Sequence, residues 1–338
     1  SKQLISMEEV LVPYVFNSIL RSYQVDAFRW LYMLYKLGMG ACLADDMGLG
    51  KTIQTLALLQ KLKEENEAAD THGTSLIVMP TSLIYNWLNE AKKFTPKLKI
   101  LAHTGTARNK DVSKFIKYDV IITTYGITRV DISLLKEFYF NYIILDESQN
   151  IKNPSSKSFK AVRALKAKHR LILSGTPVEN SVGDLWTQLT FLNPGLLGTQ
   201  AFFNKEYVQA IEKRKDEEKA RKLQAIIKPF VLRRTKEQVA EELPPKTEQI
   251  IYCKMTDDQS EYYEKIKSAY RNDLLSSMDD GTYAKKQIQM LQGLTSLRQL
   301  ANHPVMIDQT YQSDSGKFEN VIHTLDNVLK GGHKVLIF

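Results

Sequence analysis

The sequence predicts an α/β fold, in which helices cover both faces of a parallel sheet, followed by a largely helical C-terminal region. Between residues 40 and 175, short β-rich runs alternate with longer helical patterns, which is typical of consecutive β-α-β units. After about residue 195 the chain becomes charged and helical in pattern. These two observations predict an α/β lobe and a separate helical part.

Each element follows from a local pattern. Apolar residues recur at helical spacing in 52–65 and 82–94, and 64–73 reads as a frayed helix end and surface loop. Charged helices are expected over 201–234, and the two prolines of the LPP run at 243–245 indicate a domain boundary. The predicted strands are 40–44, 76–80, 98–103, 119–124, 141–146, 170–174, 248–255 and 333–338, and the later helices are 257–277 and 283–301.

Composition and charge narrow the class of protein. The chain has 338 residues, and 46 Lys and Arg against 38 Asp and Glu give a net charge of +8, which suits a polyanionic partner. Only Cys42 and Cys253 occur, which argues against a disulfide scaffold or a cysteine-rich zinc site. No apolar run approaches the ~20 residues that span a bilayer, and no secretory signal opens the chain. We therefore expect a cytoplasmic protein, nucleoid-associated if it is bacterial, with no membrane partner.

The strongest local signal is DDMGLGKT at 45–52, between a predicted strand and a predicted helix. This is the context of a phosphate-binding loop, whose backbone N–H groups and helix N-terminus contact the phosphates. Gly48 and Gly50 let the backbone curl around the anion. Lys51 would neutralise the phosphates, and the Thr52 hydroxyl would bind Mg²⁺. Asp45 stands where the usual pattern has its first Gly.

Two further strand ends carry candidate residues. Asp146 and Glu147 directly follow an apolar run, as in enzymes that place one carboxylate beside Mg²⁺ and a second beside the attacking water. Asp146 is the predicted metal ligand and Glu147 the predicted general base. LSGTP at 173–177 leaves another predicted strand. Alone it would be a turn, but at the same edge it is expected to couple the phosphate site to a neighbouring surface. These coupling residues are Ser174, Gly175 and Thr176.

Long stretches then identify a resemblance. DDMGLGKT, DESQNIKN and LSGTPVENSVGDLW resemble motifs I, II and III of superfamily-two helicases, specifically of the Swi/Snf-like ATPases that translocate on double-stranded DNA. The stretches 20–31, 78–90, 229–248 and 297–304 are also similar to that family. The DESQ tetrad departs from the more frequent DEAH or DEGH, a form associated with bacterial members. The resemblance implies ATP and Mg²⁺ as cofactors and a RecA-like P-loop NTPase lobe.

The resemblance also implies roles for individual residues. Gln24 would read the adenine edge, with Arg21 nearby, and Gln149 would join motif II to motif III. The predicted nucleotide-binding set is Arg21, Gln24, Asp45, Asp46, Met47, Gly48, Leu49, Gly50, Lys51, Thr52 and Gln149. Residues resembling motifs Ia and Ib would contact the DNA backbone. They are Pro80, Thr81, Ser82, Thr123, Thr124 and Tyr125.

Some residues keep two interpretations. Trp87 falls at helical spacing, and core packing is favoured over base stacking. Arg233 and Arg234 are either arginine fingers or DNA contacts, or they serve packing and ion pairing at the junction between lobes.

The domain organisation is also predicted from the resemblance. We expect a RecA-like lobe over 1–198, a helical protrusion with a return to that lobe over 199–243, and a linker, a second protrusion and the first strand of a second lobe over 244–338. Motifs V and VI do not follow in the sequence, and motif VI supplies the catalytic arginines of the family. The chain is therefore expected to bind Mg·ATP and to hydrolyse it slowly, since an arginine finger is worth roughly 10³–10⁵ in rate.

Several functions stay open at this point. The favoured one is translocation on double-stranded DNA, with a DNA-bound complex such as RNA polymerase or a nucleosome-like target as a further partner. An RNA or single-strand helicase is the first alternative. An ATP-gated binding switch is the second, and Glu147 counts against it because a switch needs no general base.

Overall fold

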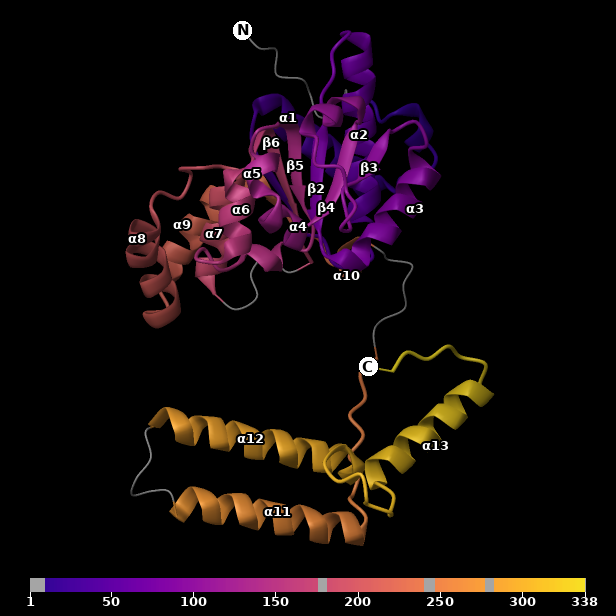
Figure 1. Ribbon diagram of the computed structural model, residues 1–338, viewed down its shortest axis with the longest axis vertical. Coiled ribbons are helices and arrows are strands. Elements are labelled where there is room, and N and C mark those ends of the chain that lie inside the picture. Colours follow the sequence, from indigo (N-terminus) through magenta and orange to yellow (C-terminus); the bar gives the residue numbers. More distant parts are fainter. Residues whose placement is uncertain (1–9, 176–180, 240–246, 277–282, 338) are drawn as a thin grey trace. The chain divides into compact units, whose positions relative to one another are not determined.

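The computed structural model describes residues 10–175, 181–239, 247–276 and 283–337. The chain divides into two compact units, Ser1–Pro244 and Pro245–Phe338. The first unit is built on a seven-stranded sheet of order β3-β4-β2-β5-β6-β1-β7, and every recorded pairing is parallel (Figure 1). The predicted α/β fold is confirmed.

The runs predicted as strands between residues 40 and 175 all contain a strand. The strands are β1 (Ala41–Leu43), β2 (Ser75–Met79), β3 (Ile100–Ala102), β4 (Val120–Thr124), β5 (Tyr139–Leu145), β6 (Lys166–Leu173) and β7 (Val231–Leu232). β7 is a correction, because 201–234 was expected to be helical throughout. Its residues pair with Cys42 and Leu43 at the sheet edge, and a strand this short has no periodicity to detect.

Helices cover both faces of the sheet (Figure 1). One apolar cluster joins α1 (Ser22–Leu37), α2 (Lys51–Ala68) and α3 (Ile84–Phe94) to Ile77 and Met79 of β2. A second cluster takes Leu76 and Val78 of the same strand. Because successive side chains of a strand point to opposite faces, one strand contributes to two cores. The second face is covered by α4 (Tyr125–Val130), α6 (Lys157–Ala164) and α7 (Val182–Leu192). Beyond α7, the same cluster continues into α8 (Gln200–Phe203), the π-helix Asn204–Lys213 and α9 (Glu217–Ile227).

The charged stretch after residue 200 is broken rather than continuous. The π-helix ends at Lys213, and Lys215 takes a φ of 55°, which turns the chain. Asp216 then caps α9, because its side chain accepts a hydrogen bond from the Lys219 N–H. Short helices complete the unit: Tyr14–Phe16, Thr81–Leu83, Val112–Lys117, α5 (Ile132–Leu135), Ser148–Ile151, Lys228–Phe230 and α10 (Lys236–Val239).

The second unit is helical in its described residues. It contains α11 (Asp257–Ser276), α12 (Tyr283–Asn302), the turn Pro304–Met306 and α13 (Gly316–Lys330). Gln259 links three segments, since its side chain donates to the Leu300 carbonyl at 2.7 Å and accepts from the Gly316 N–H at 3.2 Å. A Cβ at Gly316 would lie 2.0 Å from the Lys254 carbonyl oxygen, so only glycine fits there.

The strands predicted at 248–255 and 333–338 are wrong over their described residues. The described part of this unit contains no strand that could pair with them, and unpaired extended backbone has no ladder to stabilise it. Over the described residues, no helix is both long and apolar enough to cross a membrane.

Candidate nucleotide-binding site

Three predicted motifs meet at one edge of the sheet. β1 leads into the phosphate loop, β5 ends at Leu145 just before Asp146, and β6 ends at Leu173 just before Ser174. β6 lies between β1 and β5 in the sheet. Because all three strands are parallel, their carboxyl ends lie at the same edge, where α/β proteins bind ligands. The topology therefore brings the three motifs together.

The phosphate loop has the backbone that its glycines permit. Gly48 and Gly50 have φ values of 88° and 83°, in the left-handed region that favours glycine. Gly50 is the N-cap of α2, which begins at Lys51. A Cβ at Gly50 would lie 2.5 Å from the Gln24 amide nitrogen, so a side chain there would displace that amide. The first N–H groups of α2 have no partner within the helix and form an anion-binding end.

Lys51 lies in this loop close to both predicted carboxylates. Its Nζ donates to the carbonyls of Asp45 at 2.6 Å and Asp46 at 3.3 Å. Burial lowers the pKa of Lys51, while Glu147 and Asp146 are the strongest of the nearby charges that act in the opposite direction. The charge of Lys51 therefore interacts with the charges of both Asp146 and Glu147.

Asp45 forms a buried ion pair that the sequence did not predict. Its side chain is fully buried and pairs with Arg234, at 3.0 Å to Nε and 2.5 Å to Nη2. Arg234 also donates to the Tyr23 carbonyl and, at 3.1 Å, to the Gln54 side chain. The carboxylate that replaces the first Gly of the usual pattern thus binds the start of the loop to the segment after β7. Arg233, its neighbour, is exposed.

Asp146 is held rigidly at the end of β5. The Trp87 indole N–H donates to its Oδ2 at 2.8 Å, and the Glu147 N–H donates to its Oδ1 at 2.9 Å. The Tyr125 hydroxyl donates to its main-chain carbonyl at 2.8 Å. Burial raises the pKa of Asp146 to about 6, although the Trp87 hydrogen bond opposes this rise. Trp87 is 1% exposed, so it is core, and it also orients this carboxylate.

Glu147 occupies a strained backbone position. Its φ of 49° lies in the left-handed region, which is uncommon for residues other than Gly, Asn and Asp. The turn ends β5 sharply and leaves the Glu147 side chain partly exposed. The Gln149 amide donates to Glu147 Oε2 at 2.8 Å. Strained residues of this kind cluster at active sites.

Gln24 contacts the phosphate loop instead of lying free. Its side-chain nitrogen donates to the Leu49 carbonyl at 3.1 Å, and its oxygen accepts from the Arg21 N–H at 3.0 Å. The Leu49 carbonyl also accepts from the Tyr23 hydroxyl at 3.2 Å. Both ends of the amide are engaged within the protein, so adenine recognition by Gln24 and Arg21 stays a prediction.

The coupling residues lie beside the phosphate loop. The Ser174 N–H donates to the Leu43 carbonyl at 3.1 Å. A Cβ at Gly175 would lie 3.2 Å from Met47, whose side chain is 69% exposed on the loop. Thr176 lies outside the described residues. Ser174 thus continues the pairing of β6 with β1, and Gly175 lies beside the loop at Met47.

The residues predicted to contact DNA divide into exposed and buried sets. Thr81 and Ser82 are exposed and Pro80 is half-buried. Thr123 is fully buried and donates to the His103 carbonyl at 2.9 Å, and Thr124 caps α4. Tyr125 is buried, with its hydroxyl on the Asp146 carbonyl. Direct hydroxyl contact with DNA is therefore available to Thr81 and Ser82 but not to the buried residues.

The side chains at this edge fit a phosphate-bound magnesium ion. Mg²⁺ takes oxygen ligands and is usually held by one or two protein groups together with substrate phosphates. Thr52, in the first turn of α2, and Asp146 offer a hydroxyl and a carboxylate. The described residues contain no group of three or more His, Cys, Asp or Glu that could hold a metal ion. A magnesium ion here would need the phosphates of the nucleotide as ligands.

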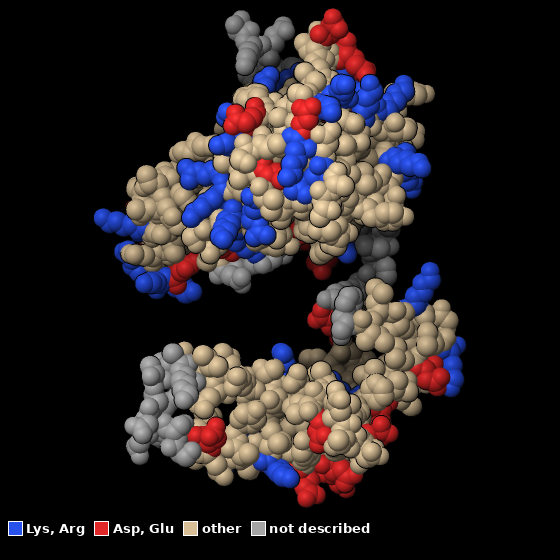
Figure 2. Space-filling model, viewed as in Figure 1, with Lys and Arg blue, Asp and Glu red and all other residues tan. Residues whose placement is uncertain are grey.

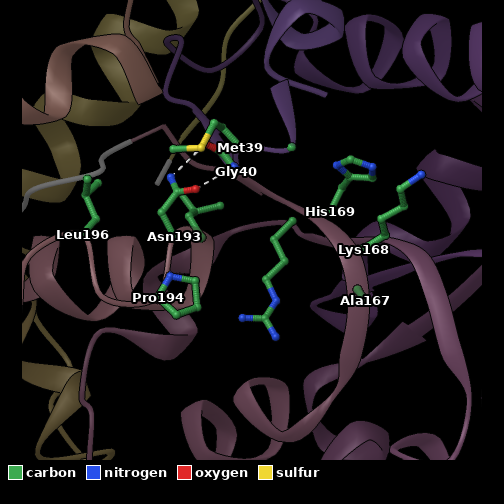
Figure 3. Close-up of a pocket in the computed structure, with 11 residues that line it drawn as sticks. Met39, Gly40, Ala167, Lys168, His169, Asn193, Pro194 and Leu196 are labelled. Atoms are coloured by element: carbon green, nitrogen blue, oxygen red, sulfur yellow. Dashed lines mark hydrogen bonds between the residues drawn. The ribbon is translucent and has the colours of Figure 1, made fainter. Parts of the chain in front are cut away.

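A separate cavity of about 470 Å³ lies at the opposite edge of the sheet (Figure 3). It is lined by residues before β1 and in the first half of β6, at the amino ends of the strands. Asn193 closes it on one side: its Oδ1 accepts from the Gly40 N–H at 2.8 Å, and its Nδ2 donates to the Gly40 carbonyl at 3.1 Å. This cavity is therefore distinct from the phosphate loop.

His169, beside this cavity, makes stability depend on pH. Its ring lies 4.2 Å from that of Tyr35, and neither ring nitrogen has a hydrogen-bond partner among the described residues. Burial lowers the pKa of His169 to about 4. Between pH 6.5 and pH 4, His169 is protonated in the unfolded state but neutral in the folded state, so the free energy of unfolding falls as pH falls. We expect a loss of about 1–2 kcal/mol between pH 7 and pH 5 that His169→Phe does not show.

The measurement is denaturant unfolding followed by tryptophan fluorescence. All three tryptophans, Trp30, Trp87 and Trp186, belong to the first unit, so the signal reports that unit alone. Comparing wild type with the variant cancels the contribution of Asp146, whose raised pKa acts in the opposite direction. If the unfolding free energies of wild type and His169→Phe change with pH in parallel, His169 is not the source of the pH dependence.

A parallel sheet whose carboxyl edge carries a glycine-rich loop, a lysine and an Asp-Glu pair defines the lobe of a P-loop NTPase. Comparison with protein families narrows this class: the model of the SNF2-related domain matches residues 23–306. The chain belongs to this family. The SWI2/SNF2 ATPase core of Sulfolobus solfataricus, solved in complex with dsDNA, is 41% identical with a TM-score of 0.63, and the match covers 96% of this chain and 68% of that one.

Two curated relatives show how much of a longer protein the chain matches. It is 38% identical over 333 residues to the putative ATP-dependent helicase/translocase YwqA of Bacillus subtilis, a match that covers 96% of this chain and 35% of YwqA. It is 39% identical over 329 residues to the TATA-binding protein-associated factor mot1 of Schizosaccharomyces pombe, covering 89% of this chain and 17% of mot1. The chain thus spans about a third or less of these relatives.

Proposed function

We propose that the chain is the ATP-binding lobe of a DNA-dependent ATPase that translocates on double-stranded DNA and remodels protein–DNA complexes. The observation that carries this proposal is the position of Lys51 beside Asp146 and Glu147, at the carboxyl edge of one sheet. Membership of the SNF2-related family supports it.

Each residue has a distinct role in this proposal. The amides of the loop and Lys51 bind the phosphates, and Thr52 and Asp146 face the Mg²⁺ ion. Magnesium would neutralise charge on the phosphates. Glu147 takes the proton of the attacking water, and Gln149, hydrogen-bonded to it, orients that carboxylate. Ser174 and Gly175 link this site to the rest of motif III.

Double-stranded DNA is the proposed partner. The Sulfolobus relative was solved with dsDNA, and the net charge of +8 suits a polyanion. Figure 2 shows that Lys and Arg outnumber Asp and Glu on the visible face of the first unit. A DNA-bound protein complex, such as RNA polymerase or a nucleosome-like target, would be the object that is moved. The protein would then act where the DNA is, in the cytoplasm or nucleoid of a bacterium.

We further propose that this chain binds Mg·ATP and hydrolyses it slowly by itself. The catalytic arginines of the family belong to motif VI, which the sequence does not contain. Positioning and electrostatic stabilisation provide most of the catalysis in phosphoryl transfer, so loss of the arginines affects hydrolysis far more than binding.

ATP binding and hydrolysis, measured with and without linear DNA, test this proposal. We expect Mg·ATP to bind to this chain, and blunt duplex to stimulate the ATPase of a protein that carries the complete second lobe. Stimulation by single strands or RNA but not by duplex would favour a helicase that separates strands. Rapid DNA-stimulated turnover by this chain alone would contradict slow hydrolysis, and absence of nucleotide binding would contradict the whole proposal.

A further inference from the structure

The segment after β7 runs along the phosphate loop. The Ala44 N–H donates to the Leu232 carbonyl at 2.7 Å, and the Asp46 N–H donates to the Arg234 carbonyl at 3.0 Å. The Lys236 N–H in turn donates to Asp46 Oδ2 at 3.1 Å. With the buried Arg234–Asp45 ion pair, these bonds fix the main chain of residue 236 beside the loop.

The side chain of Lys236 then lies over Gly48. A Cβ built on Gly48 would lie 3.6 Å from the Lys236 Cε and 3.8 Å from its Nζ. Lys236 is an exposed residue, and no carboxylate within the described residues pairs with its Nζ. The Lys236 side chain therefore lies along the outside of the glycine-rich turn and does not extend into solvent.

We propose that Lys236 is a second phosphate-binding cation of the nucleotide site. Lys51 approaches the phosphates from within the loop, where it is partly buried, and Lys236 approaches from the outside of the turn at Gly48. The Lys236 main chain is held by Asp46, so its side chain starts from a fixed point beside the loop. This inference rests on the proposed function, because it requires that the loop bind a nucleotide.

The surroundings explain why a second cation is useful. Asp45, Asp46, Asp146 and Glu147 all act on Lys51, and they also repel a bound triphosphate. Asp45 is paired with Arg234, but the remaining carboxylates exceed the charge of Lys51. An ammonium beside Gly48 offsets part of this repulsion.

Calorimetric titration of the chain with ATP, ADP and AMP in the presence of Mg²⁺ tests the role of Lys236. We expect Lys236→Ala to weaken ATP binding by about 2- to 5-fold, in the range of a partly exposed charge pair. The loss should diminish from ATP to ADP to AMP as phosphate charge is removed. It should also shrink at high salt, because exposed charges are screened. Lys236→Arg, which keeps the charge, should restore most of the affinity.

Lys228→Ala is the matched control, since it removes an equally exposed lysine ahead of β7. Its nucleotide affinity should equal that of wild type. An equal effect of both alanine variants, or a loss that is independent of phosphate number and salt, would overturn the proposal and leave Lys236 with a packing role. If wild type binds no nucleotide at all, it is the proposed function that fails.

Discussion

Replacing Glu147 by Gln should leave ATP binding nearly unchanged and lower hydrolysis by about 10²–10⁴-fold, the usual contribution of a general base. The amide keeps the shape of the side chain and can still contact Gln149, whose nitrogen lies 2.8 Å from the carboxylate. It cannot take a proton from water. Binding is measured on this chain, and turnover on protein that carries the complete second lobe.

Glu137→Gln provides the control for this experiment. Glu137 is an exposed carboxylate that precedes β5, at the opposite edge of the sheet from Glu147. Its substitution should change neither binding nor turnover. If the Glu147→Gln protein hydrolyses ATP at the wild-type rate, another group takes the proton. If it no longer binds ATP, Glu147 is a binding residue.

Removing Arg234 should cause the largest loss of stability. Arg234→Ala leaves the carboxylate of Asp45, which is fully buried, without its cation. Breaking a buried pair in this way costs about 3–5 kcal/mol. The free energy of unfolding, followed by tryptophan fluorescence of the first unit, should fall by this amount. ATP binding should weaken too, since the same pair fixes the start of the phosphate loop.

A double variant distinguishes loss of the ion pair from a general disruption of packing at Arg234. Asp45→Asn combined with Arg234→Ala removes the unpaired charge, so the double variant should recover at least half of the lost stability. Arg233→Ala, which truncates the exposed neighbour, should change stability by less than about 0.5 kcal/mol. If the double variant is no more stable than Arg234→Ala, the pair is not the source of the effect.

The sheet was predictable because its strands are locally encoded. Buried parallel strands are continuous apolar runs, such as 76–80 and 141–146. β7 was missed because Val231 and Leu232 are too few to form a pattern. The strands predicted at 248–255 and 333–338 failed because a strand needs a partner, and the described residues of the second unit provide none.

The candidate site was predictable in part for the same reason. The glycine-rich loop and the Asp-Glu pair were found from residue types and from the strands that precede them. Trp87 was correctly placed in the core, but its hydrogen bond to Asp146 could not be read from helical spacing. The hydroxyls of Thr123 and Tyr125 were expected at DNA, and the fold buries both.

The sequence by itself determined the order of strands and helices along the chain, the glycine-rich turn before Lys51 and the acidic pair after β5. These features depend on residues that are neighbours in sequence: the spacing of apolar residues, the conformational freedom of glycine and the turn at the end of a strand. Only the tertiary structure decided that Arg234 pairs with Asp45, that Lys236 lies over Gly48 and that Trp87 holds Asp146. Such contacts join residues from 59 to 189 positions apart. They arise because a parallel sheet gathers distant strand ends at one edge, and a buried charge must find its partner there.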